Sequence, residues 1–138
     1  MANVNSYSYQ VPEEREFGYA QALEVGNTIY VSGQLSIDEE GHFLYPGDFE
    51  AQLKQLYANF DKVLEHFDAT RAQVVSETQY VVNLPEHSAA MADTNRAYFR
   101  GHRPTSTTVG VHSLVFPGQL IEITFVVDTR LHPLVRRY

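Results

Sequence analysis

Cysteine is absent from all 138 residues of this sequence. Its absence excludes disulfide bonds, thiolate nucleophiles, cysteine-ligated zinc and iron–sulfur clusters. Positive charge is scarce, because 10 Lys and Arg residues stand against 17 Asp and Glu residues, for a net charge of −7. Proteins that bind nucleic acids present basic surfaces to the phosphates, so the sequence argues against nucleic acid as a partner.

Long hydrophobic runs are also missing. The longest, residues 120–127, is interrupted by Glu122 and Thr124, and it is far shorter than the roughly 20 residues that cross a bilayer as a helix. Residues 1–10 lack the basic start and apolar stretch of a secretory signal. We therefore expect no membrane partner and a cytoplasmic location.

Motifs for metal and phosphate binding are lacking as well. The six histidines do not have the spacing of a zinc-binding helix. The acidic turn at residues 38–41 lacks the alternating ligands of a calcium loop, and we interpret it as a solvated hairpin turn. No glycine-rich phosphate loop and no Gly-x-Ser-x-Gly motif occurs. We expect no metal site.

The overall composition and length are typical of one folded domain. Hydrophobic residues make up 43% of the chain, and its length is typical of a single domain. The sequence pattern divides the chain into an N-terminal arm (1–16), which could also form a short edge element, one domain (17–130) and a C-terminal tail (131–138).

Hydrophobic periodicity predicts an α+β order of elements. The predicted elements are a hairpin over 19–32 around Gly26-Asn27, a helix over 48–67, a strand over 73–83, a helix from Pro85 to about Phe99, and strands over 106–111 and 120–128. Two helices cannot cover both faces of such a mixed sheet, so we expect both on one face. The other face retains apolar residues, which predicts a homo-oligomer that covers it.

Glu122 is the most informative single residue, because it is an acid in the middle of an otherwise apolar strand. Burying a carboxylate is costly unless it is paired. The pattern alone leaves three interpretations open: a functional acid, an edge-strand residue facing water, or a partner of arginine across an interface.

Five short motifs occur in order across residues 17–130. They are Phe-Gly-Tyr-Ala-Gln-Ala at 17–22, Ile-Tyr-Val-Ser-Gly-Gln at 29–34, Ala-Gln at 51–52 with Asn-Phe at 59–60, Asn95 with Tyr98 and Phe99, and Ile-Glu-Ile at 121–123. In order and spacing they resemble the Rid family, the reactive intermediate deaminases that are also called YjgF or L-PSP proteins.

The resemblance implies a chorismate-mutase-like α+β fold and a homotrimer, in which three sheets form a central barrel with clefts between subunits. Well-known members of the family hydrolyse enamines and imines to ammonia and a 2-oxo acid, without a cofactor. Glu122 matches the glutamate that positions the attacking water. Tyr19 and Ser32 match residues that line the cleft around a small-molecule substrate.

One departure from the family pattern bears on the substrate. The family's deaminases carry Pro-Ala-Arg-Ser before the penultimate strand, where the Arg holds the substrate carboxylate, but this chain has Pro-Thr-Ser-Thr at 104–107. Ser106 takes the place of the Arg, and Thr108 that of a frequent Cys. Arg100 and Arg103 are near in sequence, although Arg103 would have to fold back to replace the missing Arg. The resemblance is therefore to a divergent branch.

Three functions follow from these observations. The first is a hydrolytic enamine or imine deaminase for a small metabolite other than short imino acids, with Glu122 as catalytic residue. Tyr19, Ser32, Ser106 and Thr108 would bind its substrate through hydroxyl, amide or ring groups. The second is a non-catalytic module that binds a small ligand or an interaction partner. The third, an endoribonuclease, is disfavoured by the net charge of −7.

Overall fold

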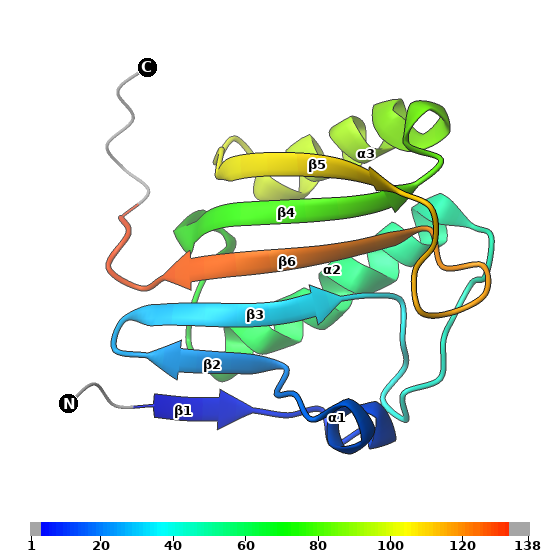
Figure 1. The fold of residues 1–138 in the computed structure, drawn as a ribbon. Helices are drawn as coiled ribbons and strands as arrows, with labels where there is room; N and C mark the ends of the chain where they lie inside the picture. The colour runs from blue at the N-terminus through cyan, green and yellow to red at the C-terminus, as the bar shows by residue number, and fades with distance from the viewer. Residues whose placement is uncertain (1–3, 133–138) are drawn as a thin grey trace.

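A six-stranded mixed sheet organises the protein, whose computed structural model describes residues 4–132 (Figure 1). The strand order is β1-β2-β3-β6-β4-β5, and every neighbouring pair is antiparallel except β4 and β5. The elements are β1 (Val4–Tyr7), α1 (Pro12–Phe17), β2 (Ala22–Val25), β3 (Thr28–Gln34), α2 (Phe49–His66), the 3₁₀ turn η1 (Arg71–Gln73), β4 (Val74–Val82), α3 (Leu84–Phe99), β5 (Thr105–Val111) and β6 (Ile121–Asp128).

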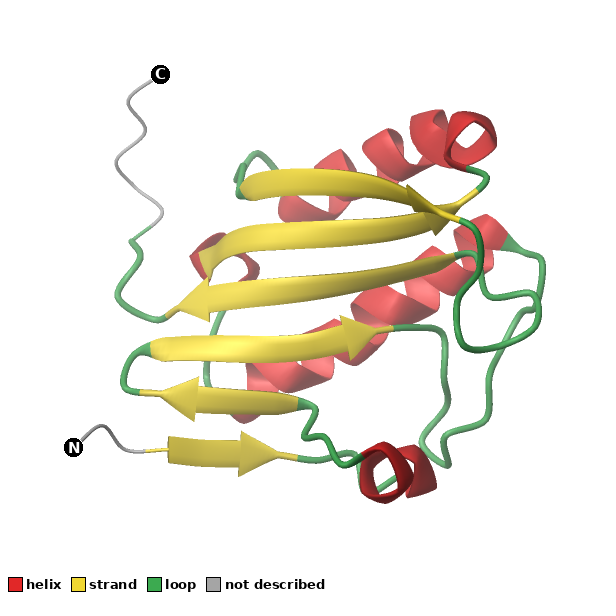
Figure 2. Ribbon diagram, in the orientation of Figure 1, coloured by secondary structure: helices red, strands yellow, loops and turns green. Residues whose placement is uncertain are grey.

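The two long helices, α2 and α3, lie together on one face of the sheet, which confirms the predicted α+β arrangement (Figure 2). The segment expected as an N-terminal arm contains β1, which pairs with β2 at the sheet edge, and most of α1. Residues 133–138 of the expected tail lie outside the described residues. Within residues 4–132, no helix is long and apolar enough to cross a membrane.

Helix α2 supplies most of the helical side of the core. The Asp48 side chain caps its N-terminus by accepting a hydrogen bond from Ala51 N at 3.1 Å. Its apolar residues then recur every three or four positions and are buried against the sheet. The ring of Phe60 stacks on that of Phe125 from β6, with centroids 3.7 Å apart. These contacts fix β6 beneath the helix.

Strand β6 lies in the middle of the sheet, between β3 and β4. Alternate residues Ile121, Ile123, Phe125 and Val127 are fully buried under the helices, as the period-two pattern predicts. Glu122 therefore points to the opposite face and does not lie on an edge strand. The helix-free side is called the open face below.

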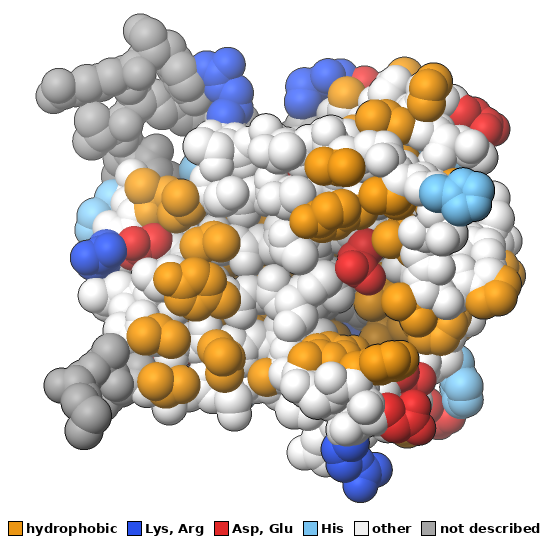
Figure 3. All heavy atoms as spheres, in the orientation of Figure 1, with side chains coloured by type: hydrophobic (Ala, Val, Ile, Leu, Met, Phe, Trp, Pro, Cys, Tyr) orange, Lys and Arg blue, Asp and Glu red, His pale blue; other side chains and the backbone are white. Residues whose placement is uncertain are grey.

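The open face carries exposed apolar side chains in patches separated by polar ones. Leu23 pairs with Tyr30, Tyr30 pairs with Val126, and all three alternate with core residues. Leu23 and Tyr30 remain 41% and 54% exposed. Figure 3 shows this face with its hydrophobic side chains gathered in patches, while the Lys and Arg side chains visible in the view lie around its margin. Exposed apolar patches of this kind favour an interaction surface on the open face.

Two buried carboxylates elsewhere in the fold, those of Glu14 and Glu77, differ in the hydrogen bonds that they accept. Glu14 of α1 accepts hydrogen bonds from Ser8 Oγ, Tyr9 N and Val11 N. Burial opposes its ionisation, but these hydrogen bonds outweigh burial and hold the pKa of Glu14 below its usual value. Glu77 of β4 faces the helices, is 1% exposed, and has one oxygen, Oε2, without a hydrogen-bond partner.

Replacing Glu77 by glutamine is expected to stabilise the protein at neutral pH. Burial raises the pKa of Glu77, and the polar side chains of Ser106 and Asn95 oppose only part of that rise. A raised folded-state pKa means that the protein is stabilised below the usual glutamate pKa and loses that stability as pH rises through the folded value. Relief of an unsatisfied buried charge is worth about 1–3 kcal/mol. Thermal unfolding should show a higher Tm for Glu77→Gln at pH 8 and little gain at pH 4.

Glu14→Gln is the matched control, because its charge is well satisfied. That variant should unfold at a lower temperature than the wild type at pH 8. A Glu77→Gln variant that is also less stable than the wild type at pH 8 would show that the Glu77 charge is compensated.

Candidate active site

Glu122 lines a hollow of about 280 Å³. The hollow is enclosed by residues of α1, the segment after it, the end of β3, the β5–β6 loop and β6. These residues are Glu13, Phe17, Tyr19, Ser32, Gly33, Leu35, Val115, Phe116 and Glu122. The structure thus brings together three of the residues identified in the sequence, Tyr19, Ser32 and Glu122.

A β-bulge in β3 shapes the floor of the hollow. Val31 pairs with Phe125 and Gln34 pairs with Ile123, so β3 uses one residue more than β6 over this stretch. Such an insertion bends a strand and redirects its side chains, often beside functional sites. Here it places Ser32 and Gly33 next to Glu122.

Gly33 lies directly against the Glu122 side chain. A Cβ at position 33 would lie 2.5 Å from Glu122 Oε2 and 2.9 Å from its Cγ. Real Cβ atoms essentially never approach other heavy atoms this closely, so only glycine fits beneath the carboxylate in this position. The absence of a side chain at Gly33 thereby fixes where the Glu122 carboxylate rests.

Glu122 is a half-buried carboxylate with few polar contacts. Burial raises its pKa, and the side-chain amide of Gln119 opposes the rise. The contact is long, since Gln119 Nε2 lies 3.5 Å from Glu122 Oε1. An acid in this environment can accept a proton from water and return it, as general acid–base catalysis requires.

The loop between β5 and β6 is held in place from α2. The buried amide of Gln52 donates to Gly118 O at 2.8 Å and accepts from Leu120 N at 2.8 Å. The rings of Phe43 and Phe116 stack with centroids 5.2 Å apart. Phe116 therefore lines the hollow from a fixed loop, and the same loop holds Gln119 beside Glu122.

Tyr19 and Ser32 supply hydroxyl groups to the lining. The Ser32 hydroxyl donates to Ala20 O at 2.6 Å, which ties the bulge to the segment that carries Tyr19. Burial raises the pKa of the Tyr19 phenol, and the carboxylates of Glu14, Glu13 and Glu122 add to the rise. Tyr19 therefore keeps its proton at neutral pH and can donate a hydrogen bond into the hollow.

Ser106 and Thr108 do not join this group within one protomer. They pair with Glu77 and Gln79, and the Thr108 hydroxyl donates to Gln79 Oε1 at 2.8 Å. Glu122 pairs instead with Tyr80, whose side chain alternates to the other face. Both β5 residues thus lie two strands from Glu122 and on the side of the helices, although β5 is an exposed edge strand.

Arg100 and Arg103 are also remote from the hollow within the protomer. They lie in the turn between α3 and the start of β5, at the left end of that strand in Figure 1, whereas Glu122 is near the start of β6 at the right. Neither arginine lines the hollow. Within one protomer, neither Arg100 nor Arg103 can therefore contact a molecule in the hollow.

The sequence analysis assigned no role to three residues of the lining, Phe17, Gly33 and Val115, or to Gln119 beside Glu122. Gly33 and Gln119 gain their roles from contacts with Glu122. Phe17 and Val115 stand out only by exposure, at 68% and 67%. A large apolar residue flanked by turn residues was the one available clue, and it applies to Phe17 before Gly18 and to Val115 before Pro117.

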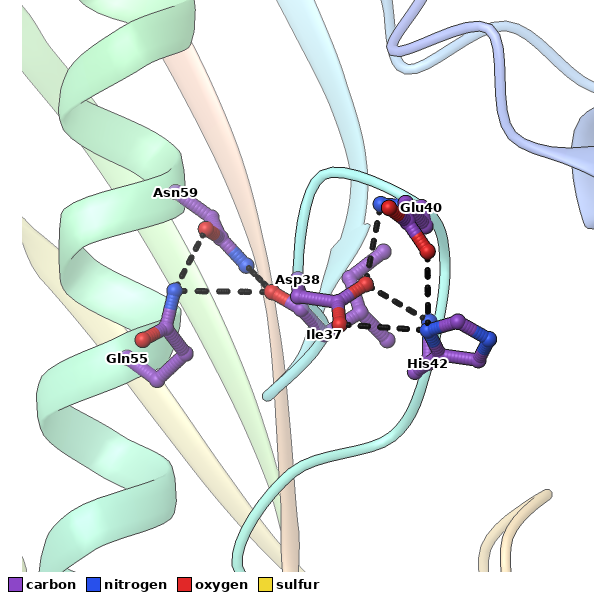
Figure 4. Close-up of polar contacts among 6 residues, drawn as sticks. All are labelled: Ile37, Asp38, Glu40, His42, Gln55 and Asn59. Atoms are coloured by element: carbon purple, nitrogen blue, oxygen red, sulfur yellow. Dashed lines mark hydrogen bonds and ion pairs between the residues drawn. The ribbon is translucent and has the colours of Figure 1, made fainter.

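The acidic turn at 38–41 is held by internal hydrogen bonds (Figure 4). Asp38 Oδ1 accepts from Glu40 N and His42 N, both at 2.9 Å, and Asp38 Oδ2 lies 3.2 Å from the His42 ring. Asn59 Nδ2 donates to Ile37 O at 3.0 Å, which joins the turn to α2. Among residues 4–132, no group of three or more His, Cys, Asp or Glu side chains is arranged to hold a metal ion.

Comparison with known proteins finds a matching family model and several relatives of this chain. The family model described as Endoribonuclease L-PSP matches residues 12–129. A RutC family protein of Pyrococcus abyssi is 35% identical over 96 residues, covering 70% of this chain and 75% of the relative. A 2-iminobutanoate/2-iminopropanoate deaminase of Dermatophagoides farinae is 30% identical over 96 residues, covering 70% and 74%. The crystal structure of a Yersinia pestis protein of the Rid family, of unknown function, superposes with a TM-score of 0.74 at 31% identity, covering 80% of this chain and 86% of that one.

Proposed function

The chain belongs to the endoribonuclease L-PSP family, which includes the Rid and YjgF proteins, and from this membership we propose that it is a hydrolytic deaminase of imines and enamines. Its substrate is a small metabolite other than a short imino acid. The observation that carries the proposal is the Glu122 carboxylate, which is half-buried beside a hollow large enough for a small molecule. A deaminase among the relatives supports the reaction class.

The chemistry follows from the arrangement of the lining. Glu122 holds a water molecule and accepts its proton as the oxygen attacks the imine carbon. The resulting aminoalcohol receives the proton on nitrogen, and ammonia leaves as Glu122 accepts the hydroxyl proton and the carbonyl forms. The protonated Tyr19 phenol donates a hydrogen bond to the polar end of the substrate. Gln119 orients Glu122 Oε1.

Ser106, in the place of the Arg that the family resemblance leads us to expect, sets the substrate apart from short imino acids. A charge-assisted hydrogen bond to a carboxylate anchor is worth roughly 1.5–3 kcal/mol. The nine residues that one protomer contributes to the lining also include no Lys, Arg or His. A short imino acid whose main handle is its carboxylate would thus bind weakly and be repelled by Glu122.

We propose further that three copies assemble through the open face. The apolar surface around Tyr30 and Leu23 needs a cover, and the family resemblance gives three subunits around a central barrel. In such an assembly the exposed edge strand β5 of one copy can close the hollow of its neighbour. Ser106 and Thr108 would then contribute to a site from which they are distant within one chain.

Sedimentation velocity at micromolar concentration should therefore report a mass of three chains. Tyr30→Glu places a charge in the centre of the covered surface and should release monomers. Tyr45→Glu is the matched control, because Tyr45 is similarly exposed, at 48%, but lies in the loop before α2. A monodisperse wild-type monomer would contradict the shared cleft.

The reaction class is tested by ammonia release from carboxylate-free imines generated in situ by an amine oxidase. The protein should accelerate release well beyond the uncatalysed rate and form one carbonyl product per ammonia. If a ligand binds the hollow but no imine is hydrolysed faster than in buffer, the protein is a binding module and not a deaminase.

A further inference from the structure

The lining that one protomer gives to the hollow at Glu122 carries two carboxylates and no basic side chain. Glu13 and Glu122 both face it, and none of the other seven lining residues is basic. Glu13 Oε2 is buried and has no hydrogen-bond partner. It is packed near Gly41, where a Cβ would come within 2.7 Å of that oxygen.

Tyr19 shows that the two carboxylates act on the same space. Glu13 and Glu122 both contribute to the raised pKa of the Tyr19 phenol, beside the larger effects of burial and Glu14. Glu13, Tyr19 and Glu122 all line the same hollow. A ligand in contact with Tyr19 would therefore be within reach of both carboxylates.

The remaining walls are aromatic and aliphatic. Phe17 and Phe116 stand with Tyr19 as three aromatic rings, and Leu35 and Val115 complete the apolar lining. Phe17 and Val115 are largely exposed at the rim, where a ligand would cover them. Aromatic rings attract cations through their electron-rich faces and also bury apolar groups.

We propose that the substrate is a carboxylate-free iminium cation with an aryl or branched aliphatic body. The inference rests on the proposed deaminase function and specifies its substrate class. The cationic nitrogen lies between Glu122 and Glu13, and the apolar body packs against Phe17 and Phe116. Glu13 is a specificity-determining residue, because it favours a positive ligand and disfavours a carboxylate.

The reaction on such a substrate balances without a cofactor. Water adds its oxygen to the iminium carbon while Glu122 takes one proton. The same proton passes to the amino group of the tetrahedral intermediate. The carbon–nitrogen bond then breaks as the hydroxyl proton is released and the carbonyl forms. An iminium ion and water give an aldehyde or ketone and an ammonium ion.

A matched pair of imines tests the substrate class. An amine oxidase converts 2-phenylethylamine to an imine without a carboxylate, and an amino-acid oxidase converts phenylalanine to the imine with the same aryl group and a carboxylate. The protein should accelerate ammonia release from the first at least tenfold more than from the second. Preference for the carboxylate-bearing imine would overturn the inference and leave the deaminase function standing.

Glu13→Gln tests the residue assigned to specificity. Removing one of two nearby charges should reduce the preference for the carboxylate-free imine by about tenfold, mainly through KM. Glu16→Gln is the matched control, because Glu16 lies on the same helix, is exposed and does not line the hollow. An unchanged preference in Glu13→Gln would remove Glu13 from substrate selection.

A binding measurement distinguishes an error in the inferred substrate class from an error in the proposed deaminase function. Calorimetry should show 2-phenylethylammonium binding at least tenfold more tightly than 3-phenylpropanoate, an anion with a similar aryl body. If that order holds and neither imine is hydrolysed, the deaminase function fails while the cationic selectivity stands. If the anion binds equally or better, the inference is wrong whatever the turnover.

Discussion

Glu122→Gln is expected to lower the kcat of imine hydrolysis by about 10²–10⁴-fold, the usual contribution of a general acid–base residue. Glutamine keeps the shape of the side chain but cannot accept a proton from water at neutral pH. Because burial raises the pKa of Glu122, removing its charge should stabilise the fold at pH 8. That gain should vanish below the usual glutamate pKa, where the wild-type carboxyl is also neutral. Loss of activity together with a higher Tm therefore distinguishes a catalytic role from a structural one.

The variant is compared with the wild type by ammonia release under saturating substrate and by sedimentation. Glu50→Gln is the matched control, because Glu50 is an exposed carboxylate in the first turn of α2, away from the hollow. It should retain wild-type kcat. Unchanged turnover in Glu122→Gln would assign Glu122 to structure alone.

The second large effect is expected from Gly33→Ala. The added methyl group would lie 2.5 Å from Glu122 Oε2 and 2.6 Å from its Cδ. The carboxyl group cannot remain in place, and a displacement of about 1 Å at a catalytic group can cost 10²-fold in rate. We expect kcat to fall by roughly 10–100-fold, measured with the same ammonia assay.

Two further variants are compared with Gly33→Ala. Gly110→Ala is the matched control for folding, since a Cβ at Gly110 would meet Leu84 at an ordinary 3.6 Å, and the variant should keep the wild-type Tm. In the Glu122→Gln background, Gly33→Ala should add little further loss, because both changes act through one side chain. Fully additive losses would mean that Gly33 affects turnover by another route.

The regular elements could be predicted from the sequence because their signal is local. The alternation along β6 and the three- and four-residue spacing along α2 both follow from which residues are buried. The four-residue edge strand β1 agrees with the short edge element considered for residues 1–16, whereas the six-residue helix α1 was not identified. Helices this short are marginal on their own, and α1 depends on the Glu14 hydrogen bonds to Ser8 and Val11.

The candidate site could be predicted only in part, because register decides which residues meet. Tyr19, Ser32 and Glu122 were identified and share the hollow. The bulge that brings Ser32 and Gly33 to Glu122 depends on pairing between strands about 90 residues apart, which no local pattern reveals. Ser106 and Thr108 lie on the helix side because β5 pairs in parallel register with β4, and a shift of one residue would reverse their face.

The central claim is that the hollow at Glu122, closed by a neighbouring copy, is where substrate binds. A crystal structure with 2-phenylethylammonium, the saturated analogue of the carboxylate-free imine, tests it most directly. We expect three copies around a threefold axis, the ammonium within hydrogen-bond distance of Glu122, and β5 of the adjacent copy at the rim. Binding instead in the polar hollow of about 320 Å³ lined by Tyr9, Asn59 and Lys62, with Glu122 open to bulk solvent, would contradict the claim.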